Sequence, residues 1–151
     1  MYGSYWDAGE ADDSAGGGAK IDFPLAKVVE LELRGTYYPN LVTDVIGQRI
    51  EVKATPLDGG LRVTFLPSGR VHLFAGAGLS FYLLTTDRGE IDNTSGIYGL
   101  VGLDFGNAAS RFFVEAMWRK MDTEVTFMAI GRDVEFDGLA ADAGVVWRWG
   151  R

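Results

Sequence analysis

Two kinds of side chain in this sequence could do chemistry: a single histidine and a set of carboxylates. His72 is the only histidine, so a metal site with several histidine ligands is excluded. Asp7, Glu10, Asp12 and Asp13 form an acidic cluster of the type that hard cations prefer, but their spacing does not match an EF-hand loop. We interpret the cluster as a solvated loop, and we predict no metal and no cofactor.

Charged residues of both signs also recur at alternating positions along much of the chain. Two carboxylates held side by side can act as general acid and general base. In a narrow protein interior, however, such residues must pair with cations because an unpaired buried charge is very costly. We therefore predict a structural ionic network without catalytic residues. Its predicted members are Glu30, Glu32, Arg34, Asp58, Arg62, Asp104, Glu115, Arg119, Asp142 and Arg148.

Composition narrows the classes of function further. The net charge of −7 argues against a nucleic-acid partner, which would need a basic surface. The absence of cysteine excludes disulfides and thiolate chemistry. No run of 18 apolar residues is present, so no transmembrane helix is expected. The chain opens MYGSYWDAGE without a secretory signal, so either it is not exported or the sequence begins after the signal.

The dominant pattern along the chain is period-two alternation of apolar and polar residues, which predicts β-strands. Glycine accounts for 21 of 151 residues, which suits tight turns and curved strands. We predict a single all-β domain over 1–151, an eight-stranded antiparallel up-and-down barrel. Its strands are expected near 2–7, 17–25, 28–39, 49–66, 70–86, 95–106, 111–126 and 133–150.

The predicted connections alternate between short and long. Those after the second, fourth and sixth segments are short (PLAK, PSGR, GNAASR), whereas the first, third, fifth and seventh are longer and polar, the third being PNLVTDVIGQ. Short turns at one end and long loops at the other are typical of transmembrane β-barrels. The seventh connection contains TEVTFMAI and DVEFDGLA, which predict a hairpin turning near Gly131 and Arg132. Its edges could recruit a partner strand, or it could be a stiff loop without a partner.

The apolar and polar positions fall on opposite faces of most segments. Val71 to Leu83, for example, carries an uninterrupted apolar row on odd positions. In the fourth segment the apolar positions change from even (Val52, Ala54) to odd (Leu57, Leu61), which predicts a bulge near Thr55-Pro56.

Two barrels fit this alternation. A lipocalin-like soluble barrel would turn the apolar face inward and bind a small apolar ligand, whereas an outer-membrane barrel turns that face to lipid. The regular charges on the polar face favour the membrane barrel, because eight strands leave an interior just wide enough for paired side chains. Large aromatic residues near the segment ends also favour it, as lipid-facing girdles at the two interfaces. They are Tyr37, Phe65, Phe81, Phe105, Phe112, Trp118, Trp147 and Trp149.

The chain resembles the small outer-membrane barrels typified by the OmpX and OmpA transmembrane domains. The strings that carry the resemblance are GGGAKIDFPLAKVVELELRGTYY, PLDGGLRVTFLPSGRVHLFAGAGLSFYLL and GLAADAGVVWRW. The resemblance implies location in a bacterial outer membrane, contact with its lipid, a monomer, and a structural, adhesion or surface-interaction role without a large pore.

Some barrels of this kind are lipid-modifying enzymes that use a His and a Ser facing the outer leaflet. His72 follows the PSGR turn and is expected at the opposite, periplasmic end. We therefore predict that the protein is not an enzyme.

Overall fold

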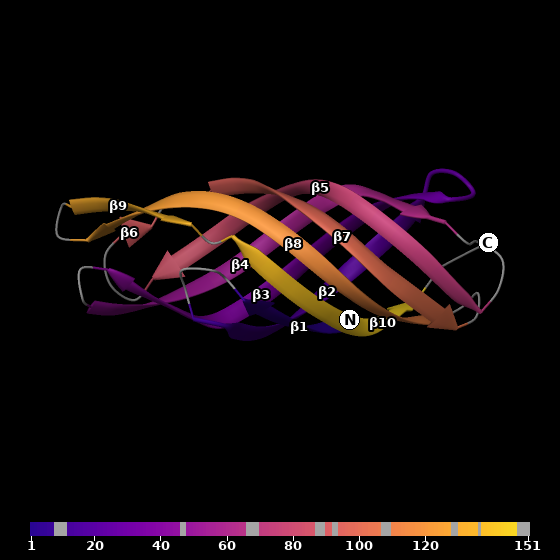
Figure 1. Cartoon of the computed structure of the whole chain (residues 1–151), viewed down its shortest axis with the longest axis horizontal. Helices are drawn as coiled ribbons and strands as arrows, with labels where there is room; N and C mark the ends of the chain where they lie inside the picture. Colours follow the sequence, from indigo (N-terminus) through magenta and orange to yellow (C-terminus); the bar gives the residue numbers. More distant parts are fainter. Residues whose placement is uncertain are drawn as a thin grey trace.

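The structure is a computed structural model of the chain, and it describes residues 1–7, 12–45, 48–65, 70–86, 90–91, 94–106, 110–127, 130–135 and 137–147. All of the assigned secondary structure is β-strand (Figure 1). The strands are β1 (Tyr2–Asp7), β2 (Ser14–Pro24), β3 (Val29–Val45), β4 (Gln48–Thr64), β5 (Val71–Thr86), β6 (Glu90–Ile91), β7 (Thr94–Gly106), β8 (Ser110–Phe127), β9 (Ile130–Glu135) and β10 (Gly138–Trp147).

Eight of these strands form a closed antiparallel barrel. Each of β1 to β5, β7, β8 and β10 pairs with its neighbours in the chain, and β10 also pairs with β1 to close the sheet. Figure 1 shows the strands crossing the long axis obliquely, with the turn between β2 and β3 at the right-hand end. The predicted all-β, up-and-down barrel is therefore confirmed. Within the described part of the chain, no helix is long and apolar enough to cross a membrane.

Two predicted segments differ from the strands observed. The eighth, 133–150, is divided between β9 and β10, because residues up to Glu135 pair with β8 outside the barrel wall. The predicted third loop, PNLVTDVIGQ, is largely strand: β3 runs to Val45 and β4 starts at Gln48. Both differences arise because hairpins continue beyond the barrel, where no change in polarity pattern marks the end of the wall.

The long-loop end, on the left in Figure 1, carries a small extra sheet. β8 continues past the barrel wall, where it pairs with β9 from Asp122 to Phe127 and with β6 at Val125 and Thr126. The chain reverses between Phe127 and Ile130, so the predicted turn at Gly131 and Arg132 is wrong by a few residues, and both lie within β9.

The bulge lies in β3 rather than in β4. Tyr38 pairs with Ala54 and Leu41 with Val52, so β3 has one more residue than β4 over this interval. β4 pairs with β5 without interruption from Val52 to Thr64, which makes the predicted bulge near Thr55-Pro56 wrong. Val52 and Ala54 therefore point into the barrel, whereas Leu57 and Leu61 point out of it.

Side chains divide sharply between the two sides of the wall. The exposed outer face is apolar, with Leu79 70% exposed and Val101 57% exposed. The interior is filled by charged, aromatic and aliphatic side chains that are all but inaccessible. Glycines make room for them: a Cβ at Gly60 or Gly78 would lie 2.5 to 2.8 Å from atoms of the Tyr98 ring and hydroxyl.

Candidate functional site: the ionic interior

Strand register brings the charged residues together inside the barrel. Paired residues on antiparallel strands project to the same side of the sheet. Lys20 pairs with Arg34, Arg34 with Asp58, and Asp58 with Ser80, so one inward row crosses four strands. On the opposite wall Asp142 pairs with Glu115. Alternation along each strand therefore places opposite charges across a narrow lumen.

Arg34 occupies the centre of this interior. Its guanidinium lies 2.5 Å from Glu32, 2.6 Å from Glu115 and 3.0 Å from Asp142. Lys20 completes the cluster, with its ammonium 3.2 Å from Glu32 and 3.1 Å from Glu115. These side chains are buried, so each charge depends on its partners to offset the lost hydration.

A second ion pair lies closer to the long-loop end. The Arg119 guanidinium donates two hydrogen bonds to the Asp58 carboxylate, at 2.9 and 2.8 Å. The Ser80 hydroxyl donates a third hydrogen bond to Asp58, at 2.6 Å. Such a bidentate pair fixes both position and orientation.

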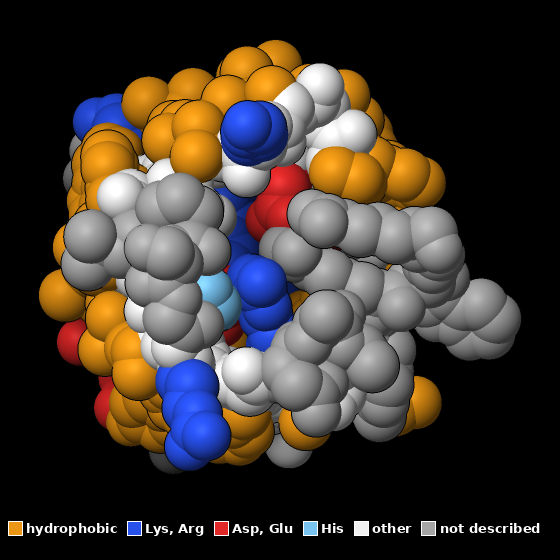
Figure 2. Space-filling model, turned by 90° about the vertical axis from the view of Figure 1, so that its right-hand side faces the viewer, with side chains coloured by type: hydrophobic (Ala, Val, Ile, Leu, Met, Phe, Trp, Pro, Cys, Tyr) orange, Lys and Arg blue, Asp and Glu red, His pale blue; other side chains and the backbone are white. Residues whose placement is uncertain are grey.

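A third cluster surrounds Arg62 near the short-turn end. Arg62 bonds Asp104 and lies 3.4 Å from Asp22 and 3.7 Å from Glu30. His72 Nδ1 is 2.8 Å from the same Asp104 carboxylate. Figure 2 views the molecule from this end, where histidine and charged side chains are visible.

Aromatic rings separate and support the cationic groups. The Lys20 ammonium lies 3.7 Å from the centroid of the Phe113 ring, and the Arg62 guanidinium lies 3.7 Å from that of Phe74. Both distances are within the range of cation–π attraction. The rings thus fill the lumen between the ionic clusters and also interact with the charges.

Towards the long-loop end the interior becomes apolar. Trp6 packs against Tyr38 and Tyr82, with ring centroids 5.0 and 6.3 Å apart. Aliphatic and thioether side chains extend this apolar plug: Leu41, Val52, Ala54, Leu84, Leu100, Met117, Met121 and Ala140. The rings of Phe74 and Tyr98 belong to the same buried cluster. The described interior is therefore ionic from the short-turn end to the middle and apolar beyond.

The structure places the predicted network residues as follows. Glu30, Glu32, Arg34, Asp58, Arg62, Asp104, Glu115, Arg119 and Asp142 are all buried inside the barrel. Arg148 lies outside the described residues. Lys20, absent from the predicted network, is a central member. The signal for it was its position on the polar face of its segment, opposite Ala19 and Ile21.

The aromatic residues predicted for the outer face are placed mostly at its two ends. Tyr37, Phe65, Phe81, Phe112 and Trp118 are exposed, and Phe105 is partly exposed and packs against Phe112 with a centroid distance of 5.2 Å. Trp149 lies outside the described residues, and only the backbone of Trp147 is described. The apolar plug was not predicted, although alternation gave a signal for it: Tyr82 lies on the even-numbered face of its segment, opposite the odd-numbered apolar row that contains Phe81.

Chemically, the arrangement favours mutual neutralisation of charge. Each buried arginine is paired with at least one carboxylate, and His72 is hydrogen-bonded to a carboxylate that also binds Arg62. Within the described residues, no group of three or more potential metal ligands is present.

Comparison with known proteins gives a structural answer only. No protein family and no curated protein matches the sequence. Among solved structures, the outer membrane protein OprG from Pseudomonas aeruginosa superposes with a TM-score of 0.80 at 13% identity, covering 95% of this chain and 90% of OprG. This chain has the fold of the small outer-membrane barrels.

Neisserial surface protein A supports the same conclusion. It superposes with a TM-score of 0.66 at 14% identity, covering 97% of this chain and 92% of its own. Because so little sequence is shared, the likeness to both proteins shows the outer-membrane barrel fold alone.

Proposed function

We propose that this protein is a non-enzymatic barrel of the bacterial outer membrane, a monomer of one domain over 1–151 that acts structurally or in surface interaction and forms no large pore. The observation that carries the proposal is the inverted distribution of polarity. Large apolar side chains cover the outside, and ion-paired charges fill the middle of the interior. Water would oppose this arrangement, whereas lipid favours it.

The interior supports the absence of a pore. Arg34 and its carboxylate partners span the lumen, and the apolar plug around Trp6 fills it further along. A lipocalin-like barrel would need space for an apolar ligand in its interior. The Trp6 and Tyr82 rings occupy that region instead, packed against each other.

The hairpin of β8 and β9 supports a surface-interaction role. It extends beyond the wall at the long-loop end, which faces the cell exterior in barrels of this layout. β9 pairs with β8 along one edge, and its other edge offers backbone groups to which an extracellular partner strand could pair.

The experiment is export and fractionation in a bacterial host. The chain, fused to a secretory signal, should appear in the outer-membrane fraction and migrate as a folded barrel in unheated SDS gels. Protease added to intact cells should cleave near Arg132 in the hairpin and leave the barrel wall intact. Recovery from the periplasm without detergent would contradict the membrane proposal. Protection of the hairpin in intact cells but not in lysed cells would contradict the orientation.

A further inference from the structure

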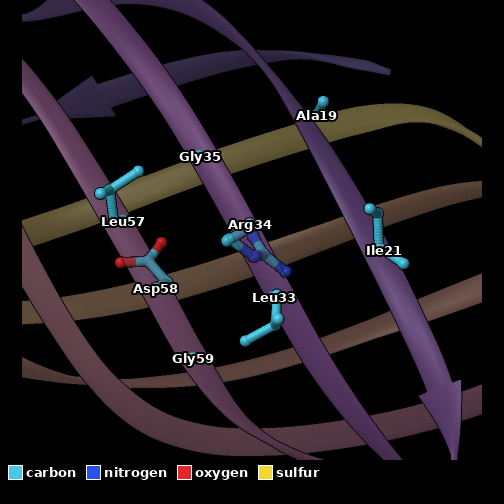
Figure 3. Close-up of a pocket in the computed structure, with 8 residues that line it drawn as sticks. All are labelled: Ala19, Ile21, Leu33, Arg34, Gly35, Leu57, Asp58 and Gly59. Atoms are coloured by element: carbon cyan, nitrogen blue, oxygen red, sulfur yellow. The ribbon is translucent and has the colours of Figure 1, made fainter.

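A shallow apolar groove crosses the outer wall of the barrel over β2, β3 and β4. Its volume is about 480 Å³, within the roughly 300–1,000 Å³ typical of ligand sites. Ala19, Ile21, Leu33 and Leu57 provide its side-chain lining, and Figure 3 shows them on three adjacent strands. Arg34 and Asp58 border it with their backbone, since their side chains are buried in the ionic interior.

Two outward-facing glycines create the hollow. Ala19 pairs with Gly35 and Gly35 with Leu57, while Leu33 pairs with Gly59. Glycine and leucine thus alternate on neighbouring strands, and the wall sinks where side chains are missing. A Cβ at Gly35 would lie 3.3 Å from Leu57, and one at Gly59 would lie 3.3 Å from Leu33, so these leucines form the sides of the groove.

These glycines differ from those that face the lumen. At Gly60 and Gly78 a Cβ would collide with backbone and with Tyr98, so interior packing requires glycine there. Gly35 and Gly59 face outward, and no interior contact accounts for them. Glycine weakens a strand, and inside a strand it often marks a place where a ligand approaches the backbone.

The position of the groove indicates the ligand. It is continuous with the exposed apolar outer face, and its lining side chains carry no charge. The end of the groove that lies nearer the long loops meets the aromatic girdle of that side. Tyr37 is the next outward residue of β3 after Gly35, and Phe81 pairs with Leu57. Such aromatic residues mark the membrane interface. A lipid acyl chain that extends from that interface into the membrane would enter the groove at its long-loop end.

We propose that this groove binds one acyl chain of a membrane lipid. The inference rests on the outer-membrane location proposed above. A chain lying over Gly35 and Gly59 contacts Leu33 and Leu57 on its flanks and backbone beneath, and so gains more dispersion contacts than on the convex wall. The groove holds that lipid in a fixed position beside β3.

The test uses the folded protein in vesicles containing phosphatidylethanolamine with a diazirine midway along one acyl chain. After illumination, mass spectrometry maps the labelled residues. In the unaltered protein we expect labelling to concentrate at Leu33 and Leu57. The double variant Gly35→Val/Gly59→Val, which fills the groove, should lose that concentration.

The matched control is Gly3→Val/Gly99→Val. These glycines also face outward but do not line the groove, and a Cβ has open space at Gly3 and ordinary clearance, 3.9 Å, at Gly99. The control should keep the labelling of the unaltered protein, and the folded-gel mobility of all three proteins should agree. Because the filling side chains contact only outer-face leucines, the filled variant is expected to fold.

Three results would overturn the inference. Even labelling of the whole outer face, including Leu79 and Val101, would show that the groove has no preference for a chain while the membrane location stands. Cross-linking to a second copy of the protein would show that the groove binds protein. No labelling at any outer-face residue would remove the membrane location and the groove's ligand together.

Discussion

At the scale of single residues, each buried charge is tied to partners from distant parts of the sequence. Asp58 and Arg119 are 61 positions apart, and Arg34 and Asp142 are 108 apart. Alternation in the sequence predicts which residues face the lumen. It does not predict which charged residues form ion pairs across the lumen, because those pairs depend on the stagger of the strands around the barrel. Nine predicted network residues lie inside, yet no feature of the sequence marks Arg34 as the centre of the network.

Removing Asp58 should strongly destabilise the barrel. Asp58→Ala leaves the Arg119 guanidinium buried without its bidentate partner, which costs about 3–5 kcal/mol. The exposed carboxylate of Glu51 is the matched control, and Glu51→Ala should change the free energy of unfolding by less than about 0.5 kcal/mol. Urea titration of the refolded barrel in lipid measures both.

A second variant separates the pair from the packing around it. Asp58→Ala/Arg119→Met removes both charges and keeps much of the arginine volume. It should be more stable than Asp58→Ala alone, because no unpaired charge remains buried. Equal free energies for the single and double variants would mean that Arg119 reaches water or another anion when Asp58 is absent.

The destabilisation caused by a charge on the outer wall should depend on how deep in the membrane the charge lies. Leu79 is the most exposed large residue of β5 and lies in the middle of that strand. Leu79→Arg should destabilise the barrel by about 2–4 kcal/mol, while Phe65→Arg at the short-turn end should cost only about 0–1 kcal/mol. Unfolding titrations in lipid give the two values. If both variants are equally mild, the outer face is not in contact with lipid.

At the scale of strands, the sequence was informative about where strands exist and less so about how they end and bend. Seven of the eight wall strands coincide with a predicted segment to within a few residues at most ends, because alternation and turn residues are local signals.

The bulge was misplaced for a physical reason. Val52 and Ala54 are apolar because they belong to the interior plug, not because β4 changes face. Lipid outside the barrel and the apolar plug inside it both favour apolar residue types, so the sequence alone does not distinguish them.

The bulge in β3 should absorb one residue without changing which side chains face the lumen. Deleting Asn40 leaves one residue between Tyr38 and Leu41, as in the facing part of β4, so Leu41 should stay inside and the barrel should lose little stability. Deleting Lys53 from β4, which has no bulge, would instead turn Val52, now fully buried, to the outer face. Losing that burial should cost roughly 1.5–3 kcal/mol. Unfolding titrations in lipid compare the two deletions, and an equal loss of stability would show that the extra residue of β3 is needed for the register.

At the scale of the whole barrel, the interior is polarised along its axis. The Arg62 and Arg34 clusters occupy the short-turn end and the middle, and the apolar plug occupies the long-loop side. In an eight-stranded barrel the lumen is only wide enough for side chains. The ionic clusters block the lumen by ion pairing, and the apolar plug blocks it by close packing of rings. Disrupting one region should therefore leave the lumen blocked by the other.

This independence predicts the electrical behaviour of the protein. In planar bilayers the unaltered barrel should show no stable, porin-sized conductance, because no continuous aqueous path crosses both regions. Arg34→Ala opens space among Glu32, Glu115 and Asp142 but leaves Trp6, Tyr38 and Tyr82 in place. It should therefore destabilise the barrel without making it conduct. Recordings of both proteins at equal folded fraction, judged by gel mobility, make the comparison. Stable large steps from the unaltered protein would contradict the plugged interior. Steps from Arg34→Ala alone would show that the ionic cluster blocks the lumen and that the apolar plug does not.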